Sequence, residues 1–248
     1  MDGGAFPTLI AIITMFFAGA VVAPLQSVFS TFLLLGVILL GIMMTFFVSR
    51  LLSKTILKGI PSSFTLELPP YRKPQIGKVI VRSIFDRTLF VLGRAAAVAA
   101  PCGLLIWLMA NITVGDITIL AHCSQFLDPL AHLMGLDGVI LLAFILGFPA
   151  NEIVVPIIIM AYMSQGSIVD LDLAALKTLL VENGWTWLTA VCTMLFSLMH
   201  WPCSTTCLTI HKETQSLKWT AVSVLVPTLF GFVICCTVAG VARLLGLV

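Results

Sequence analysis

The amino-acid sequence predicts an all-α, polytopic transmembrane protein. Of its 248 residues, 60% are hydrophobic and only 10% are charged, whereas a soluble domain carries roughly 25% charged residues. Several windows reach the ~20 apolar residues that a spanning helix needs. Two further apolar segments are each interrupted near the middle by a proline beside polar residues. Together these observations predict a helical membrane protein with two interrupted helices.

Two transmembrane helices are expected at the start of the chain. The first apolar run extends from residue 5 to about 23, and the second from residue 28 to about 48. Arg50 follows directly and marks the end of the second run, since basic side chains gather where a helix leaves the bilayer. Residues 1–50 are therefore expected to form the first unit of the protein.

Residues 51–88 are expected to form a cytoplasmic loop. Eight of the thirteen basic residues lie between positions 50 and 88, and basic loops remain on the cytoplasmic side. Residues 75–94 alternate apolar and charged side chains at a spacing typical of an amphipathic interfacial helix. This helix would lead into a third span, from residue 89 to about 109.

Residues 89–248 are expected to form one transmembrane domain. Its first connection, residues 111–136, contains acidic and histidine side chains but no lysine or arginine, which is typical of an outer loop. Residues 164–184 include a short amphipathic helix, and the last span runs from residue 221 to 245. Four side chains of the outer stretch could bind metal, namely Asp116, His122, Cys123 and His132. They could form a metal-collecting patch or be solvated loop residues. The second reading is favoured because their spacing matches no closed metal motif.

The two interrupted segments are the most informative feature of this domain. Residues 137–163 break at Pro-Ala-Asn-Glu, near positions 147–152, and residues 185–210 break at His-Trp-Pro-Cys, near positions 200–205. In hydrocarbon, such breaks are tolerated only where they are buried in protein or line a wet cavity. A pair of broken segments is the strongest sequence pointer to a transporter's substrate site.

The sequence leaves two topologies open for the broken segments, crossing the membrane or turning back. Straight crossing would place Lys212 and Lys218 outside, against the distribution of positive charge. A re-entrant first segment is favoured because each half, of about 10 to 13 residues, reaches only the bilayer midplane.

Three motifs resemble one known family over nearly the whole chain. They read LELPPYRKPQIGKV, LGFPANEIVVPIIIMAYM and HWPCSTTCLTIHKET followed by LKWT. These motifs resemble the C-terminal membrane half of the FeoB family, bacterial ferrous iron transport protein B. The resemblance implies a gate-type domain, Fe²⁺ as the transported substrate, and a multi-pass location in the lipid bilayer of the bacterial inner membrane.

The resemblance also implies what this chain needs beside it. In the family, a cytoplasmic GTPase domain and a first gate repeat precede this part. The chain has no G-x-x-x-x-G-K-[ST] phosphate loop, so it is expected neither to bind GTP nor to act as an enzyme. Its expected partners are the N-terminal GTPase and first-gate half of the transporter, or other copies of itself.

The side chains at the two breaks can bind a ferrous ion. Fe²⁺ is of borderline softness, and imidazole, thiolate and carboxylate are usable ligands. We expect Glu152 and Cys203 to face a shared polar cavity near the midplane, with Asn151 and His200 alongside and a thioether from Met199. Such a mixed, incomplete set suits an ion in transit.

Each of these side chains also has a structural reading. Glu152 could form an ion pair with Arg94 or cap the helix after the break. Cys203 could be a small packing residue, and His200 a core histidine bonded to a carbonyl group.

Two other functions remain open at this stage. One is a gate-type carrier for another divalent cation or a nucleoside-like solute, and the other is a non-transporting membrane assembly fragment. The Cys and His side chains at the breaks argue mildly against organic solutes. Nucleic acid is not an expected partner, because the net charge is only +2 and no basic patch with aromatic residues is present.

Overall fold

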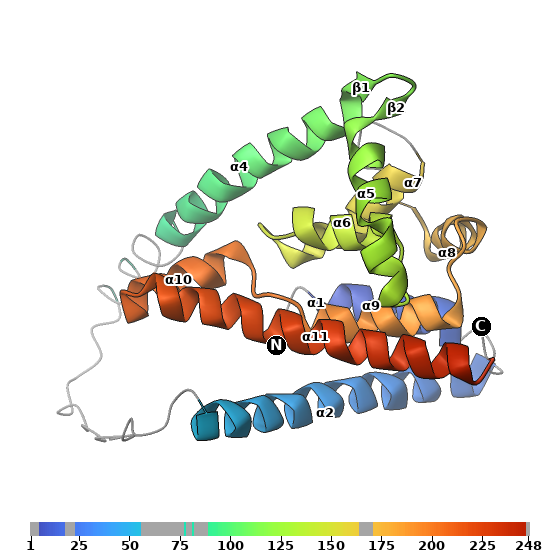
Figure 1. Ribbon diagram of the computed structural model, residues 1–248, viewed down its shortest axis with the longest axis horizontal. Coiled ribbons are helices and arrows are strands. Elements are labelled where there is room, and N and C mark those ends of the chain that lie inside the picture. The colour runs from blue at the N-terminus through green and yellow to red at the C-terminus, as the bar shows by residue number, and fades with distance from the viewer. Residues whose placement is uncertain are drawn as a thin grey trace.

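The structure is a computed structural model, and helices dominate the part of the protein that it describes (Figure 1). The described residues are 5–17, 23–55, 89–163 and 171–246, with the single positions 77 and 81. Most of the predicted cytoplasmic loop and of the amphipathic helix at 75–94 lies outside these residues. The all-α prediction with two interrupted helices is confirmed, since both predicted breaks are present.

The N-terminal part consists of a short helix and a very long one. Helix α1, Ala5–Ile12, continues into a π-helical turn, Ile13–Phe17, and together they are shorter than a full span. Helix α2, Ala23–Thr55, extends beyond both ends of the predicted span at 28–48. The long aliphatic stems of Arg50 and Lys54 allow their charges to reach the membrane interface while the helix continues. This explains the extra turns at the C-terminal end of α2.

The predicted outer loop at 111–136 is wrong in its secondary structure. After α4, Phe90–Asn111, the chain forms a small antiparallel hairpin of β1, Thr113–Val114, and β2, Ile117–Thr118. It then forms helix α5, Ile119–Leu133. The Thr118 hydroxyl accepts a hydrogen bond from the Ala121 amide at 3.2 Å and so caps α5. Charge alone suggested a loop, whereas the cap and apolar residues of α5 favour a helix.

Helices α5 and α6 cross closely and at a sharp bend. Helix α6, Gly138–Leu146, makes an angle of 108° with α5. A Cβ atom on Gly138 would lie 1.9 Å from the Ser124 carbonyl oxygen, so only glycine fits this crossing. After the first break and a 3₁₀ turn, Asn151–Ile153, helix α7 covers Val154–Tyr162. The short amphipathic helix predicted within residues 164–184 is α8, Leu173–Glu182.

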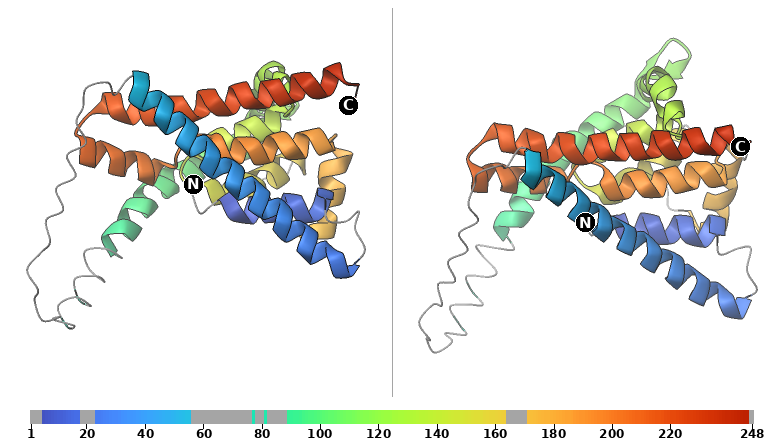
Figure 2. Two further views of the ribbon diagram at one scale, coloured as in Figure 1. Left: turned by 90° about the horizontal axis from the view of Figure 1, so that it is seen from below. Right: turned by 60° about the horizontal axis from the view of Figure 1, so that its bottom comes forward.

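The C-terminal part places the second broken segment along one long helix. Helices α9, Trp187–Met199, and α10, Ser204–Thr214, lie end to end beside α11, Leu217–Leu244 (Figures 1 and 2). The core between the broken segments is apolar, and the rings of Phe144 and Phe196 meet edge to face at 5.0 Å.

Two of the described helices, α2 and α11, are long and apolar enough to cross a membrane. The bent pair of α5 and α6 adds a third span if the pair is counted as one. Large apolar side chains point outward from α2, with Phe32 68% and Phe46 73% exposed, as expected for a helix that faces lipid.

Candidate functional site

The first break begins where helix α6 ends. Gly147 ends α6 and donates its amide hydrogen to the Ala143 carbonyl at 2.8 Å. A Cβ atom at this position would lie 2.6 Å from a methyl group of Val154, so the tight turn requires glycine. Pro149 follows and cannot donate a backbone hydrogen bond, and the chain resumes as the 3₁₀ turn of η4.

The second break begins at His200, which ends helix α9. Its amide donates to the Phe196 carbonyl at 2.8 Å, and its ring Nδ1 lies 2.9 Å from the Ser197 carbonyl oxygen. Cys203 occupies the cap position of α10, and its sulfur lies 3.1 Å from the Thr205 hydroxyl and 3.2 Å from the Thr206 hydroxyl. The structure therefore contains the predicted alternative, in which the His200 ring bonds to a backbone carbonyl group.

The two breaks contact each other directly through one serine. The Ser204 amide donates to the Phe148 carbonyl at 2.9 Å, and the Ser204 hydroxyl donates to the Pro149 carbonyl at 3.3 Å. The amide of the first residue of a helix has no acceptor within that helix. A carbonyl group just past a helix end likewise receives no hydrogen bond from that helix. Each break thus satisfies backbone groups that the other leaves unpaired. We call these two bonds the break contact.

The four predicted site residues differ in their exposure. Asn151 and His200 are buried, Cys203 is half-buried, and Glu152 is exposed on the surface of this chain. The His200 ring lies between aromatic neighbours, 5.1 Å from the ring of Phe144. The site therefore offers buried polar groups on both breaks and a carboxylate that points outward.

Sequence reasoning missed two residues at the breaks. Ser204 forms the break contact, and its only sequence signal is its position as the first residue after a proline-containing break. The indole Nε1 of Trp201 is buried and has no hydrogen-bond acceptor among the described residues. A buried donor without an acceptor costs about 1–3 kcal/mol, which makes Trp201 a polar feature of the second break beside His200 and Cys203.

A second polar cluster joins the two ends of the first broken segment. The Tyr162 hydroxyl at the end of α7 donates to Asp137, whose carboxylate caps α6 by accepting from the Ile140 amide at 2.7 Å. The Trp185 indole donates to the Tyr162 oxygen at 2.8 Å. We call Asp137, Tyr162 and Trp185 the polar clasp. Because the two ends of the segment meet, α6 and α7 form a hairpin, and the re-entrant path of this segment in the membrane stays a prediction.

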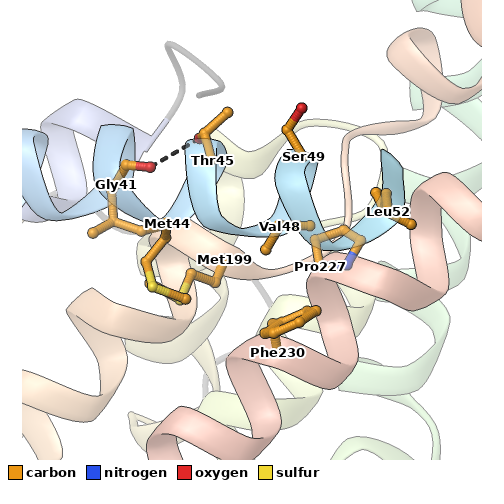
Figure 3. A pocket seen from close by; sticks show the side chains of 10 residues that line it. Gly41, Met44, Thr45, Val48, Ser49, Leu52, Met199, Pro227 and Phe230 are labelled. Carbon is orange, nitrogen blue, oxygen red and sulfur yellow. Dashed lines mark hydrogen bonds between the residues drawn. The ribbon is translucent and has the colours of Figure 1, made fainter. Parts of the chain in front are cut away.

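Two cavities border the breaks, and their walls are mostly apolar. One, of about 330 Å³, lies between α2, the end of α9 and α11, and Met44 and Met199 are among its lining residues (Figure 3). The other, of about 460 Å³, lies between α4 and the first break and includes Cys102 and Pro149. None of the four predicted site residues lines either cavity.

No group of three or more His, Cys, Asp and Glu side chains gathers to hold a metal ion within the described ranges. On the predicted outer patch, His132 pairs with Asp128 at 3.2 Å, whereas His122 bonds to the Val114 carbonyl at 3.0 Å.

Comparison with known proteins identifies two adjacent family models. Residues 34–86 match the model described as Ferrous iron transport protein B C terminus. Residues 92–217, about half of the chain, match the Gate model, described as Nucleoside recognition. The second match includes both breaks and the polar clasp.

Several curated relatives carry the name Fe(2+) transporter FeoB. The relative from Staphylococcus aureus (strain MSSA476) is 32% identical over 210 residues, which cover 81% of this chain but 30% of the relative. Those from Leptospira interrogans (strain Fiocruz L1-130) and Synechocystis sp. (strain PCC 6803) are each 28% identical, and the matches cover 29% and 35% of the relatives. The chain thus spans about a third of their length. No solved structure matches it.

Proposed function

Because this chain belongs to the FeoB family, we propose that it forms part of a pathway for ferrous iron across the bacterial inner membrane. The observation that carries this proposal is the break contact, in which Ser204 joins the Phe148 and Pro149 carbonyls. Two broken helices that meet tip to tip place freed backbone groups and polar side chains at one point inside an apolar domain. That arrangement suits an ion that exchanges its water shell for protein ligands.

The proposed ligands come from both breaks. Glu152 supplies a carboxylate that balances the charge of a divalent cation, and Asn151 supplies a carbonyl oxygen. Cys203 supplies a soft sulfur and His200 an imidazole nitrogen, which suit Fe²⁺ better than Mg²⁺ or Ca²⁺. Cys203 already accepts or donates two hydroxyl contacts, which orient its sulfur at the start of α10.

The exposed carboxylate of Glu152 supports a site that is completed by another protein segment. A carboxylate facing hydrocarbon is costly, and a charged side chain within a membrane domain normally faces a protein interior or a wet cavity. The proposed complement is the N-terminal GTPase and first-gate half of the transporter, or a second copy of this chain. Any control by GTP would then come from that complement.

A nucleoside-like solute is the second candidate cargo. It is favoured by one observation, the description of the Gate model as Nucleoside recognition over residues 92–217. Uptake of a radiolabelled nucleoside by cells that express the complete transporter, measured beside uptake of ⁵⁵Fe²⁺, separates the two candidates.

The experiment that tests the proposed function is ferrous iron uptake by the complete transporter carrying single substitutions in this chain. Glu152→Gln keeps size and hydrogen bonding but removes the charge, and Cys203→Ser removes the soft donor. Each should lower uptake at least about tenfold while membrane insertion is unchanged. Cys236→Ser, which changes another half-buried cysteine on α11, is the matched control. Normal uptake by both Glu152→Gln and Cys203→Ser would refute the proposed site.

A further inference from the structure

Helix α5 carries an apolar stripe that faces away from the core. Phe126 is 84% exposed, Leu130 44% and Leu133 58%, and they follow one another at the i, i+4, i+7 spacing of a single helix face. The core-facing side of the helix is a different one, since Leu120 and Ala131 are buried there. Three large apolar side chains in one row form a patch rather than scattered surface residues, and such a patch marks an interaction surface.

The opposite flank of α5 is polar. Gln125 and His132 are exposed and Asp128 is half-buried, and these three residues follow one another at the i, i+3, i+7 spacing of a second row. The His132 imidazole lies 3.2 Å from the Asp128 carboxylate. Viewed down its axis, α5 therefore has the protein core on one side, with the polar row and the apolar stripe on its two flanks. A helix at a membrane surface is divided in this way, with its polar flank toward water and its apolar flank toward hydrocarbon.

The C-terminal end of α5 lies where helix α11 reaches the end of its span. Arg243, in the last turn of α11, donates a hydrogen bond to the His132 carbonyl. A Cβ atom on Gly135, just after α5, would lie 3.5 Å from Leu188 in the first turn of α9, beside the exposed Trp187. Arginine and tryptophan side chains gather where helices leave the bilayer, so this end of the protein has the residues of a membrane interface.

The direction of α5 also differs from that of a spanning helix. It runs across α11 rather than along it (Figures 1 and 2), and it meets α6 at 108°. Its 15 residues extend over about 22 Å, less than the ~30 Å of a hydrocarbon core. Because α11 is long and apolar enough to cross the membrane, a helix that runs across it lies close to the membrane plane.

We propose that α5 is an interfacial helix whose stripe of Phe126, Leu130 and Leu133 inserts among the lipid acyl chains just below the headgroups. The partner is thus a lipid surface, and the polar row faces the water above it. The Asp128 carboxylate accepts a hydrogen bond from the Gly138 amide at 2.8 Å, so α5 is tied to the first residue of α6. The helix therefore fixes the base of the first broken segment at the membrane surface. This inference holds for any cargo, since it depends on the faces and the direction of α5 alone.

Depth-dependent fluorescence quenching of the full chain tests this inference. The Phe126→Trp variant is reconstituted in phosphatidylcholine vesicles, and the emission of the wild type, which has five tryptophans, is subtracted. Bromine atoms are carried by the lipid acyl chains either near the carbonyl end or near the terminal methyl group. The added indole should lose about half of its emission to the shallow bromines and much less to the deep ones, because an interfacial helix is buried by only ~5–10 Å. Since Phe126 is largely exposed, the larger ring leaves the core undisturbed.

Gln125→Trp is the matched control, because Gln125 is the neighbouring residue on the polar flank. Its indole should be quenched by iodide, present on both sides of the vesicle membrane, and not by brominated lipid. For Phe126→Trp, stronger quenching by the deep bromines would mean that α5 enters the membrane core, and quenching by iodide would mean that the stripe faces water. Insensitivity to both quenchers would mean that a second copy or another protein segment covers the stripe. Each of these three results overturns the inference, as does equal quenching of the two variants by brominated lipid.

Discussion

The first broken segment is held very differently at its two ends. At its base, the polar clasp joins three side chains from three parts of the chain, and Trp185 also stacks on Phe16 with ring centroids 5.9 Å apart. At its tip, the break contact consists of two bonds from one serine to backbone carbonyls, and the hydroxyl bond is long, at 3.3 Å.

This comparison indicates which end of the hairpin can move. Opening the base would break the hydrogen bond from Tyr162 to the Asp137 carboxylate and the bond from the Trp185 indole to Tyr162. A hydrogen bond to a charged group contributes about 1.5–3 kcal/mol, whereas each neutral bond at the tip contributes about 0.5–1.5 kcal/mol. The tip is also where Asn151 and His200 are buried and where the proposed ion passes. A hairpin anchored at its base and lightly held at its tip is suited to gating, since moving elements belong to the less stable parts of a fold.

Gly138→Ala should cause the largest loss of stability, because it disrupts the close crossing of α5 and α6. The added Cβ meets the Ser124 carbonyl oxygen at 1.9 Å, which is backbone and cannot move aside without shifting α5. We expect a loss of about 3 kcal/mol or more in the free energy of unfolding, or no folded protein. The measurement is thermal unfolding of the purified chain in detergent. Gly36→Ala is the control, because nothing lies within 4 Å of the added atom; equal stability of the two variants would contradict the close crossing.

Tyr162→Phe should weaken the clasp without moving the tip. The change leaves the Asp137 carboxylate and the Trp185 indole without the Tyr162 hydroxyl. An unsatisfied buried polar group costs about 1–3 kcal/mol, so the variant should unfold at a lower temperature and exchange the amides of α6 and α7 faster. Hydrogen exchange read by mass spectrometry checks this.

The control for the clasp is Thr178→Val, which removes an exposed hydroxyl that bonds only within α8. Its exchange pattern in α6 and α7 should match that of the wild type. Equal protection of these helices in Tyr162→Phe would show that the clasp does not anchor the hairpin.

The sequence predicted the positions of both breaks, because their cause is local. Proline removes a backbone donor and clashes with the preceding turn, which favours the end of α6 before Pro149 and of α9 before Pro202. Proline alone does not end a helix here, since Pro101, Pro129 and Pro227 lie inside α4, α5 and α11. The identity of the family also followed from these local motifs. The distribution of basic residues further favoured a re-entrant first segment, and its path through the membrane stays a prediction.

What the sequence could not provide depends on contacts between distant residues. Ser204 and Pro149 are 55 positions apart, and the local sequence around either residue does not predict their contact. Helix α5 was missed because charge distribution reports the side of the membrane rather than the backbone conformation. The exposure of Glu152 likewise depends on which segments pack against the break, and no local pattern encodes that. The roles of the four predicted ligands stay predictions.

Ser204→Ala should cause the smallest loss of stability and should weaken the tip of the hairpin alone. The substitution removes only the hydrogen bond from the Ser204 hydroxyl to the Pro149 carbonyl. The hydrogen bond from the Ser204 backbone amide to the Phe148 carbonyl remains. We expect about 0.5–1.5 kcal/mol less stability, and a smaller loss than for Tyr162→Phe, since only one neutral carbonyl group is left without its donor.

The informative readout for Ser204→Ala is local rather than global. Amide exchange should rise around residues 147–153 and 200–204, while α6 and α7 near the clasp keep their protection. Ser223→Ala is the matched control, because its hydroxyl bonds to the Thr220 carbonyl within α11 and touches neither break. If Ser204→Ala instead loosened the clasp as much as the tip, the hairpin would open as one unit, and the tip could not act as a separate gate. Faster exchange confined to the two breaks is the result that a gate at the tip requires.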